Sequence, residues 1–164
     1  MIGQILELFC KGLRVLVGLL MVALALPVAA QVLARYTGII PVYLWTEELA
    51  TFLFVWVVML GSMLAVWDGT HFSVEVLPEA KSPLGVLIQK GFVLIMLIFF
   101  GAIFAWYGIE YLKFGLLQHS VMMNANKAWT YASVPLAGAA WTVFAAYRLS
   151  EVVGHYRQSR SEPQ

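Results

Sequence analysis

Residues 49–67 read LATFLFVWVVMLGSMLAVW, a stretch without a single aspartate, glutamate, lysine or arginine. A helix rises about 1.5 Å per residue, so an uncharged run of about 20 residues can cross a hydrocarbon core roughly 30 Å thick. Similar uncharged runs occupy residues 15–34, 91–109 and 128–147. Because backbone groups in lipid must find hydrogen-bond partners within their own segment, these runs predict four transmembrane helices rather than barrel strands.

The composition agrees with a chain surrounded by lipid. Of the 164 residues, 62% are hydrophobic and only 12% are charged, whereas a soluble domain of this size needs a larger polar shell. The net charge of +1 gives no reason to expect a nucleic-acid partner. Cys10 is the only cysteine, which excludes an internal disulfide and a cysteine-cluster metal site. We expect an all-α membrane protein with a single four-helix domain over residues 1–157 and a polar tail over residues 158–164.

The first uncharged run could also be a secretory signal peptide, since Lys11 and Arg14 precede it and small residues follow it. Its apolar part is longer than that of a signal peptide, and Glu7 lies in the preceding segment, which should be basic. We therefore expect this run to remain in the protein as a membrane span.

The distribution of basic residues predicts the orientation of the helices. By the positive-inside rule, the side richer in lysine and arginine faces the cytoplasm. This rule predicts that both termini are cytoplasmic and that the connections 36–46 and 112–127 are external. The cytoplasmic group is Lys11, Arg14, Lys81, Lys90, Arg148, Arg157 and Arg160, and the external group is Arg35, Lys113 and Lys127.

Two segments next to the spans carry helical signals of their own. Apolar residues recur at helical spacing from Ile2 to Leu13, which predicts an amphipathic segment in the membrane interface; a first helix that begins early and extends into water is an equal alternative. Ser82 and Pro83 form a typical helix start, so the third helix is expected to begin near Pro83. Glu110 and Lys113 could then form an ion pair at its other end.

The second helix opens with Trp45-Thr46-Glu47-Glu48. Thr46 can cap this helix, and carboxylates in a first turn are stabilised by the free N–H groups and the helix dipole. The alternative is that one carboxylate forms a salt bridge with Arg35, whose long side chain could instead extend toward the headgroups. Adjacent carboxylates point about 100° apart on a helix, so both cannot face the same neighbour.

Other side chains suggest packing contacts. The pairs Gly61/Ala65 and Gly101/Ala105 have the spacing that permits close approach of two helices. Trp56 and Trp141 fall in the middle of spans, where they face either a helix partner or lipid. An interfacial aromatic belt is expected from Trp45, Trp67, Trp106, Tyr107, Tyr111 and Trp129.

The order of these residues resembles a known family. The ordered set is Arg35-Tyr36, Trp45-x-Glu47-Glu48-Leu49-Ala50, Phe54-x-Trp56, Gly61, Ala65 and Gly69-x-His71-x-x-Val74. It is similar to the small membrane subunit (DctQ-like) of tripartite ATP-independent periplasmic (TRAP) transporters. The similarity is strongest from about Arg35 to Glu75, and the four-helix layout extends it over nearly the whole chain. One departure is that family members often carry a basic residue near the cytoplasmic end of the second helix, where this chain has Trp67 and Asp68.

The resemblance implies an accessory or scaffold subunit of a sodium-coupled transporter in the bacterial inner membrane. Its partners would be a large multi-span membrane subunit, which holds the substrate and sodium sites, a periplasmic protein that delivers an organic acid, and membrane lipids. The chain itself would then be no enzyme and would bind no cofactor, metal or substrate. The residues expected at a partner interface or in a structural polar cluster are Arg35, Trp45, Glu47, Glu48, Trp56, Gly61 and His71.

Two other functions are possible from the residues alone. A self-assembling four-helix exporter would need a functional carboxylate within the membrane, and the candidates Glu47 and Glu48 lie at its edge. The other alternative is a membrane redox enzyme of the quinone or haem kind, and its haem version would need axial histidines that face each other inside the spans. All three histidines, His71, His119 and His155, lie outside the uncharged runs.

Overall fold

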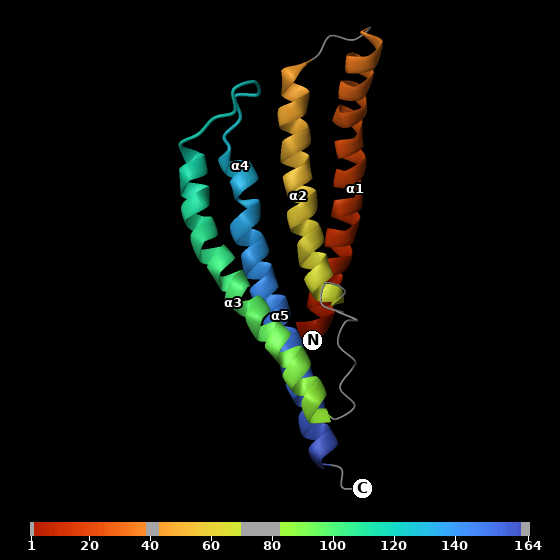
Figure 1. Cartoon of the computed structure of the whole chain (residues 1–164), viewed down its shortest axis with the longest axis vertical. Coiled ribbons are helices and arrows are strands. Elements are labelled where there is room, and N and C mark those ends of the chain that lie inside the picture. Colours follow the sequence, from red (N-terminus) through yellow and green to blue (C-terminus); the bar gives the residue numbers. More distant parts are fainter. Residues whose placement is uncertain (1, 39–42, 70–82, 162–164) are drawn as a thin grey trace.

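The computed structural model describes residues 2–38, 43–69 and 83–161. These residues form helices α1 (Ile2–Thr37), α2 (Leu44–Asp68), α3 (Pro83–Leu116), α4 (Ala128–Tyr131) and α5 (Ser133–Ser161). The predicted all-α fold is therefore confirmed. Long helices α1 and α2 pack side by side as one pair and α3 and α5 as a second, and α2 contacts α5 between the pairs. Figure 1 shows that the two pairs approach each other near the N-terminus and diverge toward the end where α4 begins.

Three of the helices contain stretches long and apolar enough to cross a membrane. These stretches are Gly3–Thr37, Leu44–Asp68 and Leu87–Leu116. Helix α5 has 29 residues but, among the described helices, does not reach the same hydropathy. Its uncharged part is rich in alanine and also contains glycine, proline and hydroxyl side chains, which contribute little hydrophobicity. The predicted fourth span therefore stays a prediction.

The N-terminal residues are part of the first long helix. No turn separates an interfacial segment from the span, because α1 is continuous from Ile2 to Thr37. The prediction of a distinct amphipathic segment is therefore wrong, and the alternative of an early helix start is correct. This early part does not project alone, since Cys10 and Leu13 are buried and the Phe9 ring meets Phe144 of α5 edge-on at 6.5 Å between ring centroids.

The last uncharged run, 128–147, is not one helix. It is split at Ala132 into the single turn α4 and the long helix α5. Pro135 explains the break, since proline has no N–H to donate to the carbonyl four residues earlier, which belongs to Tyr131. At its other end α5 continues to Ser161, so the beginning of the predicted polar tail is helical. Helix α3 starts at Pro83 as predicted.

A seam of glycines holds α3 against α5. Gly101, Gly108 and Gly115 are all buried and lie seven residues apart, which places them on one face of α3. A Cβ atom at Gly108 would lie 2.8 Å from the backbone nitrogen of Pro135. On α5, a Cβ atom at Gly138 would collide with the backbone of α3 at Gly101 and Ala105. The predicted close approach at Gly101/Ala105 is thus confirmed, and the seven-residue spacing extends it along the helix.

Gly61 behaves differently. A Cβ atom added there would have no atom of the described residues within 4 Å. No other described helix of this chain therefore approaches Gly61 closely, and its expected place at a partner interface stays a prediction. Helix α2 contacts its neighbours through the residues on its other faces, including Leu60, Met63 and Leu64 in the buried core.

We predict that Gly138→Val destabilises the protein, whereas Gly61→Val changes its stability little. The added side chain at residue 138 must push two backbones apart, and overpacking of this kind costs about 1–3 kcal/mol or more. Thermal unfolding of both variants in the same detergent measures the difference. Equal unfolding temperatures for the two variants would show that the α3–α5 seam is not closely packed.

Candidate functional site

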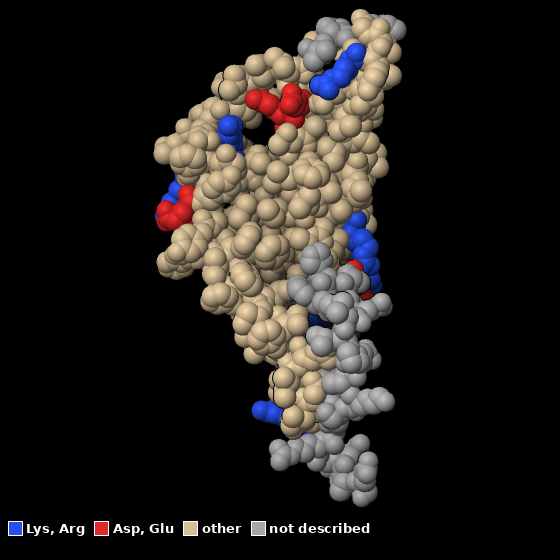
Figure 2. Space-filling model, viewed as in Figure 1, with Lys and Arg blue, Asp and Glu red and all other residues tan. Residues whose placement is uncertain are grey.

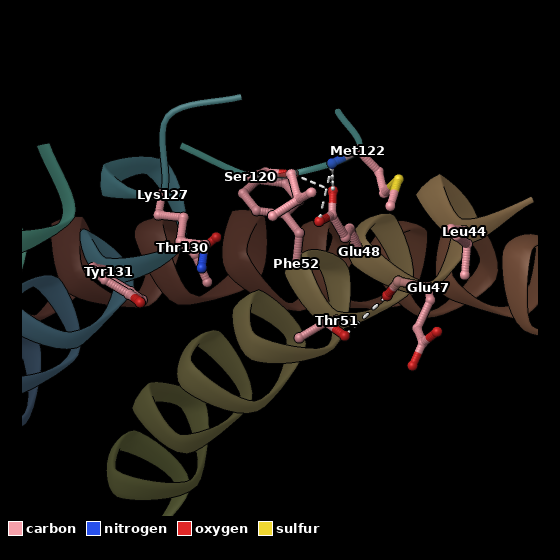
Figure 3. Close-up of a pocket in the computed structure, with 11 residues that line it drawn as sticks. Leu44, Glu47, Glu48, Thr51, Phe52, Ser120, Met122, Lys127, Thr130 and Tyr131 are labelled. Carbon is pink, nitrogen blue, oxygen red and sulfur yellow. Dashed lines mark hydrogen bonds between the residues drawn. The ribbon is translucent and has the colours of Figure 1, made fainter. Parts of the chain in front are cut away.

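A cleft lies at the end where the two helix pairs diverge. It has a volume of about 480 Å³ and is formed by the start of α2, by α4 and by the loop that joins α3 to α4. Figure 3 shows its lining side chains, and Figure 2 shows acidic side chains beside a hollow at this end of the molecule. The lining residues are Leu44, Glu47, Glu48, Thr51, Phe52, Ser120, Val121, Met122, Lys127, Thr130 and Tyr131.

The start of α2 sets the positions of the acidic residues. Tyr43 is the N-cap, with an extended backbone (φ −90°, ψ 114°). Thr46 was expected to cap the helix, but it lies inside the first turn, where its buried hydroxyl donates a 2.6 Å hydrogen bond back to the Tyr43 carbonyl. The cap prediction is therefore wrong by one helical turn. Glu47 lies in the first turn, as expected.

Glu48 fastens the α3–α4 loop to α2. Its carboxylate accepts a hydrogen bond from the Ser120 hydroxyl and further bonds from the backbone N–H groups of Met122, at 3.3 Å, and Met123, at 3.0 Å. Figure 3 shows the Glu48 side chain pointing at this loop, while Glu47 points elsewhere. One carboxylate thus satisfies several donors in a segment without regular structure, which is a strong arrangement because the acceptor is charged.

The loop that Glu48 holds is itself closed by hydrogen bonds. The Asn126 amide donates to the Leu116 carbonyl at 3.1 Å, and its oxygen accepts from the Ala128 N–H at 2.8 Å. The Lys127 N–H bonds the Gln118 carbonyl at 3.0 Å. Asn124 adopts a positive φ of 50°, a conformation that asparagine tolerates better than most residues. The loop is therefore a defined turn that connects the two ends of the second helix pair.

Two indole N–H groups also join the helix pairs. The Trp56 indole of α2 donates to the Trp129 carbonyl of α4 at 3.2 Å, and the Trp141 indole of α5 donates to the Ser62 hydroxyl of α2 at 3.2 Å. Both side chains are half-buried. Of the two alternatives for these mid-span tryptophans, contact with a helix partner is correct. These bonds connect α2 to the second pair below the Glu48 contact.

Other expected site residues lie apart from this network. Arg35 is exposed at the end of α1, and among the described residues no ion pair joins it to Glu47 or Glu48. The Glu47 side chain is exposed, and the Trp45 ring lies beside that of Tyr43, 6.3 Å away. His71 lies outside the described residues. Of the predicted set, then, the structure brings Glu48 and Trp56 into contacts between the helix pairs.

At the opposite end of α2, arginines from neighbouring helices lie close to the negative charge of Asp68 and of the helix C-terminus. The Arg14 guanidinium of α1 donates to both carboxylate oxygens of Asp68, at 3.0 and 3.1 Å. Gly69 ends the helix with φ 73°, and the Arg148 guanidinium of α5 lies against it. Positive charge near a helix C-terminus is favourable. The last turn of α2 has no basic residue of its own, and arginines from α1 and α5 supply the positive charge there.

The chemistry available at these sites is limited. Among the described residues, no group of three or more His, Cys, Asp or Glu side chains could hold a metal ion. The described ion pairs are Lys11–Glu7, Arg14–Asp68 and Lys113–Glu110, and the last was predicted from the spacing. Of these three ion pairs, only Arg14–Asp68 joins two helices, and the other two lie within α1 and α3.

The amino-acid sequence that forms these two helix pairs is similar to sequences of known proteins. The family described as tripartite ATP-independent periplasmic transporters, DctQ component, matches residues 24–154. The chain belongs to this family. A Haemophilus influenzae protein (strain ATCC 51907 / DSM 11121 / KW20 / Rd) named as a TRAP transporter small permease protein is 34% identical over 89 residues, which cover 54% of this chain and 50% of that protein. The chain thus matches about half the length of this curated relative.

Family membership and the apolar helices give a coarse function and location. The chain is a subunit of a TRAP transporter, in the inner membrane, and passes through it more than once. The description of this family is that of a transporter component. The resemblance found from residues 35–75 is therefore confirmed, and the match extends beyond that stretch.

Sequence reasoning missed the partners of Glu48. Ser120 and the backbone of residues 122 and 123 are more than 70 residues away along the chain, as the separations of 72 to 75 show. The loop did carry a signal, since Ser120, Asn124 and Asn126 are residue types that form turns through side-chain hydrogen bonds. Nothing in the sequence indicated which helix this turn would contact.

We predict that Glu48→Gln loosens the α3–α4 loop, whereas the adjacent Glu47→Gln leaves the loop unchanged. The amide offers a neutral acceptor in place of a carboxylate, and its NH₂ group opposes the loop donors. Amide hydrogen exchange at Met122 and Met123 should become about tenfold faster in the first variant. Identical exchange in both variants would contradict the assigned role of Glu48.

Proposed function

We propose that this TRAP subunit is the accessory scaffold of a sodium-coupled importer of an organic acid. A periplasmic binding protein delivers the acid, and the large membrane subunit holds the substrate and sodium sites. The present chain braces that large subunit and carries no substrate across the membrane. Its relationship to the DctQ family supports the pairing with such partners.

The placement of charge is the observation that favours a scaffold. The runs 15–34, 49–67, 91–109 and 128–147 contain no ionisable Asp, Glu, Lys or Arg. Polar groups at membrane depth are usual in proteins that transport ions or anions, because a charged solute needs partners in the low-dielectric core. A static wall needs only apolar bulk, packed helices and anchors at the interface. This chain has those features, and its four uncharged runs contain no charged side chain that could accompany such a solute.

We extend the proposal to the topology. Helix α5 is the fourth span, and both termini are cytoplasmic. The excess of basic residues at the end that carries the termini supports this orientation. Packing supports the fourth span, since α5 lies along α3 through the glycine seam, and a helix in that position shares the membrane environment of its partner.

The exposed residues at the other end are proposed to face a partner. Arg35, Trp45 and Glu47 all have exposed side chains there, and no ion pair among the described residues uses either charge. Gly61 lies further along α2 with open space beside it. These residues form a surface that a neighbouring subunit could cover. His71 belongs to the same predicted set but lies outside the described residues.

The topology predicts the accessibility of single cysteines. In a Cys10→Ser background, Lys113→Cys should react with a membrane-impermeant maleimide in intact spheroplasts. Arg157→Cys should react only after the membrane is permeabilised. Both parent residues are exposed, so neither position is protected by packing. Labelling of both positions in intact spheroplasts would contradict the proposed four-span arrangement.

Transport measurements test the scaffold role directly. In proteoliposomes with a sodium gradient, this chain together with its large subunit and binding protein should take up the organic acid. Omission of this chain should reduce uptake to near background, because the large subunit loses its support. Sodium-driven uptake by this chain alone would overturn the proposal.

A further inference from the structure

The cleft beside Glu48 contains two charges that the described part of the protein does not neutralise. Glu47 contributes a carboxylate from α2, and Lys127 contributes an ammonium group from the start of α4. Neither forms an ion pair among the described residues. Glu48 differs, because its carboxylate is already occupied by the loop donors. The cleft therefore presents one negative and one positive group for a ligand.

The two groups lie apart within the cleft. Figure 3 shows Lys127 toward one end and Glu47 toward the other, with Glu48 between them. Separate counter-ions could pair with each group, but one molecule with both an anionic and a cationic group could pair with Lys127 and Glu47 at the same time. The volume of about 480 Å³ falls within the range of about 300–1,000 Å³ that is typical of small-molecule sites.

The remaining walls of the cleft are suited to an amphipathic molecule. Leu44, Phe52, Val121 and Met122 contribute apolar surface beside the two charges. The cleft is open rather than enclosed, and it lies between helix pairs that diverge toward this end (Figure 1). An apolar tail can leave such a site sideways into the bilayer, while a charged headgroup stays between Glu47 and Lys127.

The depth of the cleft also favours a lipid. Tyr131 lines it, the Tyr131 ring stacks on Tyr111 at 4.1 Å, and exposed Trp45 and Trp129 flank the same end. Tyrosine and tryptophan gather at the level of the lipid headgroups. A phosphate at this level would meet Lys127, and an ammonium group would meet Glu47.

We propose that this cleft binds a zwitterionic phospholipid with a primary ammonium headgroup, of the phosphatidylethanolamine type. The phosphate is bound by Lys127 and the ammonium group by Glu47. An anionic lipid gains nothing from Glu47. A choline headgroup carries the same charges as ethanolamine but has no N–H to donate to the carboxylate, so it binds more weakly.

Native mass spectrometry of the full-length protein in detergent can test this site. The protein is titrated separately with phosphatidylethanolamine, phosphatidylcholine and phosphatidylglycerol of identical acyl chains. Phosphatidylethanolamine should bind about tenfold more tightly than either other lipid, which corresponds to one charge-assisted hydrogen bond. Equal binding of the ethanolamine and choline lipids, or tighter binding of the anionic lipid, would overturn the proposal without any variant.

Variants then locate the binding. Glu47→Gln should remove the preference for the ethanolamine lipid over the choline lipid, because the preference depends on the carboxylate. Lys127→Gln should weaken the binding of all three lipids, because each of them carries the phosphate. Lys113→Gln is the matched control, because Lys113 is an exposed lysine that already pairs with Glu110 at 3.1 Å and does not line the cleft. Thermal unfolding verifies that each variant is folded. A preference that persists in Glu47→Gln, unchanged lipid binding in Lys127→Gln, or equal losses in the control would place the lipid elsewhere.

A soluble ligand of the same chemistry is the remaining alternative. Free phosphoethanolamine has the same ammonium and phosphate groups but no acyl chains. It should bind at least tenfold more weakly than the lipid, because it cannot bury apolar surface against Phe52 and its neighbours. Equal affinity would reject the lipid as the occupant of this cleft.

Discussion

Hydrocarbon offers no hydrogen bonds, and the arrangement of this protein follows from that constraint. The described parts of its long uncharged runs are almost entirely helical. Its charged groups lie outside these runs, where Arg14 meets Asp68 and Glu48 meets the α3–α4 loop. Within these runs, two described indole groups and several hydroxyl groups bond each other or a carbonyl, as Trp141 does with Ser62. Each of these contacts satisfies a donor that lipid would leave unpaired. The buried Gln31 amide nitrogen, in contrast, has no hydrogen-bond partner among the described residues.

The two helix pairs are held together by different means. In the second pair, glycines spaced seven residues apart let the α3 backbone come close to α5, so dispersion forces act over a long contact. The two pairs are joined to each other by hydrogen bonds from Trp56, Trp141 and the Glu48 cluster, together with a core that includes Leu60 and Phe144. Packing therefore makes one rigid pair, and polar contacts set its position relative to α2.

Such a combination of close packing and polar contacts suits a subunit that supports another protein. Surfaces that are already packed within the chain, such as the glycine contacts between α3 and α5, keep the two helices in a fixed arrangement. Surfaces with unused groups, such as Arg35 and the open side of Gly61, remain available to neighbours. The cleft beside Glu48 combines both kinds of surface. The loop forms a fixed wall, whereas Glu47 and Lys127 form no ion pair among the described residues.

The sequence by itself determined the helical class, the membrane environment and the family, because each depends on local quantities: the length of uncharged runs and the order of a few residues. It also predicted local features such as the Glu110–Lys113 ion pair and the start of α3 at Pro83. Only the tertiary structure decided that Glu48 bonds the loop near Ser120, that α1 is continuous and that Gly61 is open. Those outcomes depend on which helix faces meet, and that is settled by the packing energy of the whole chain rather than by any segment alone.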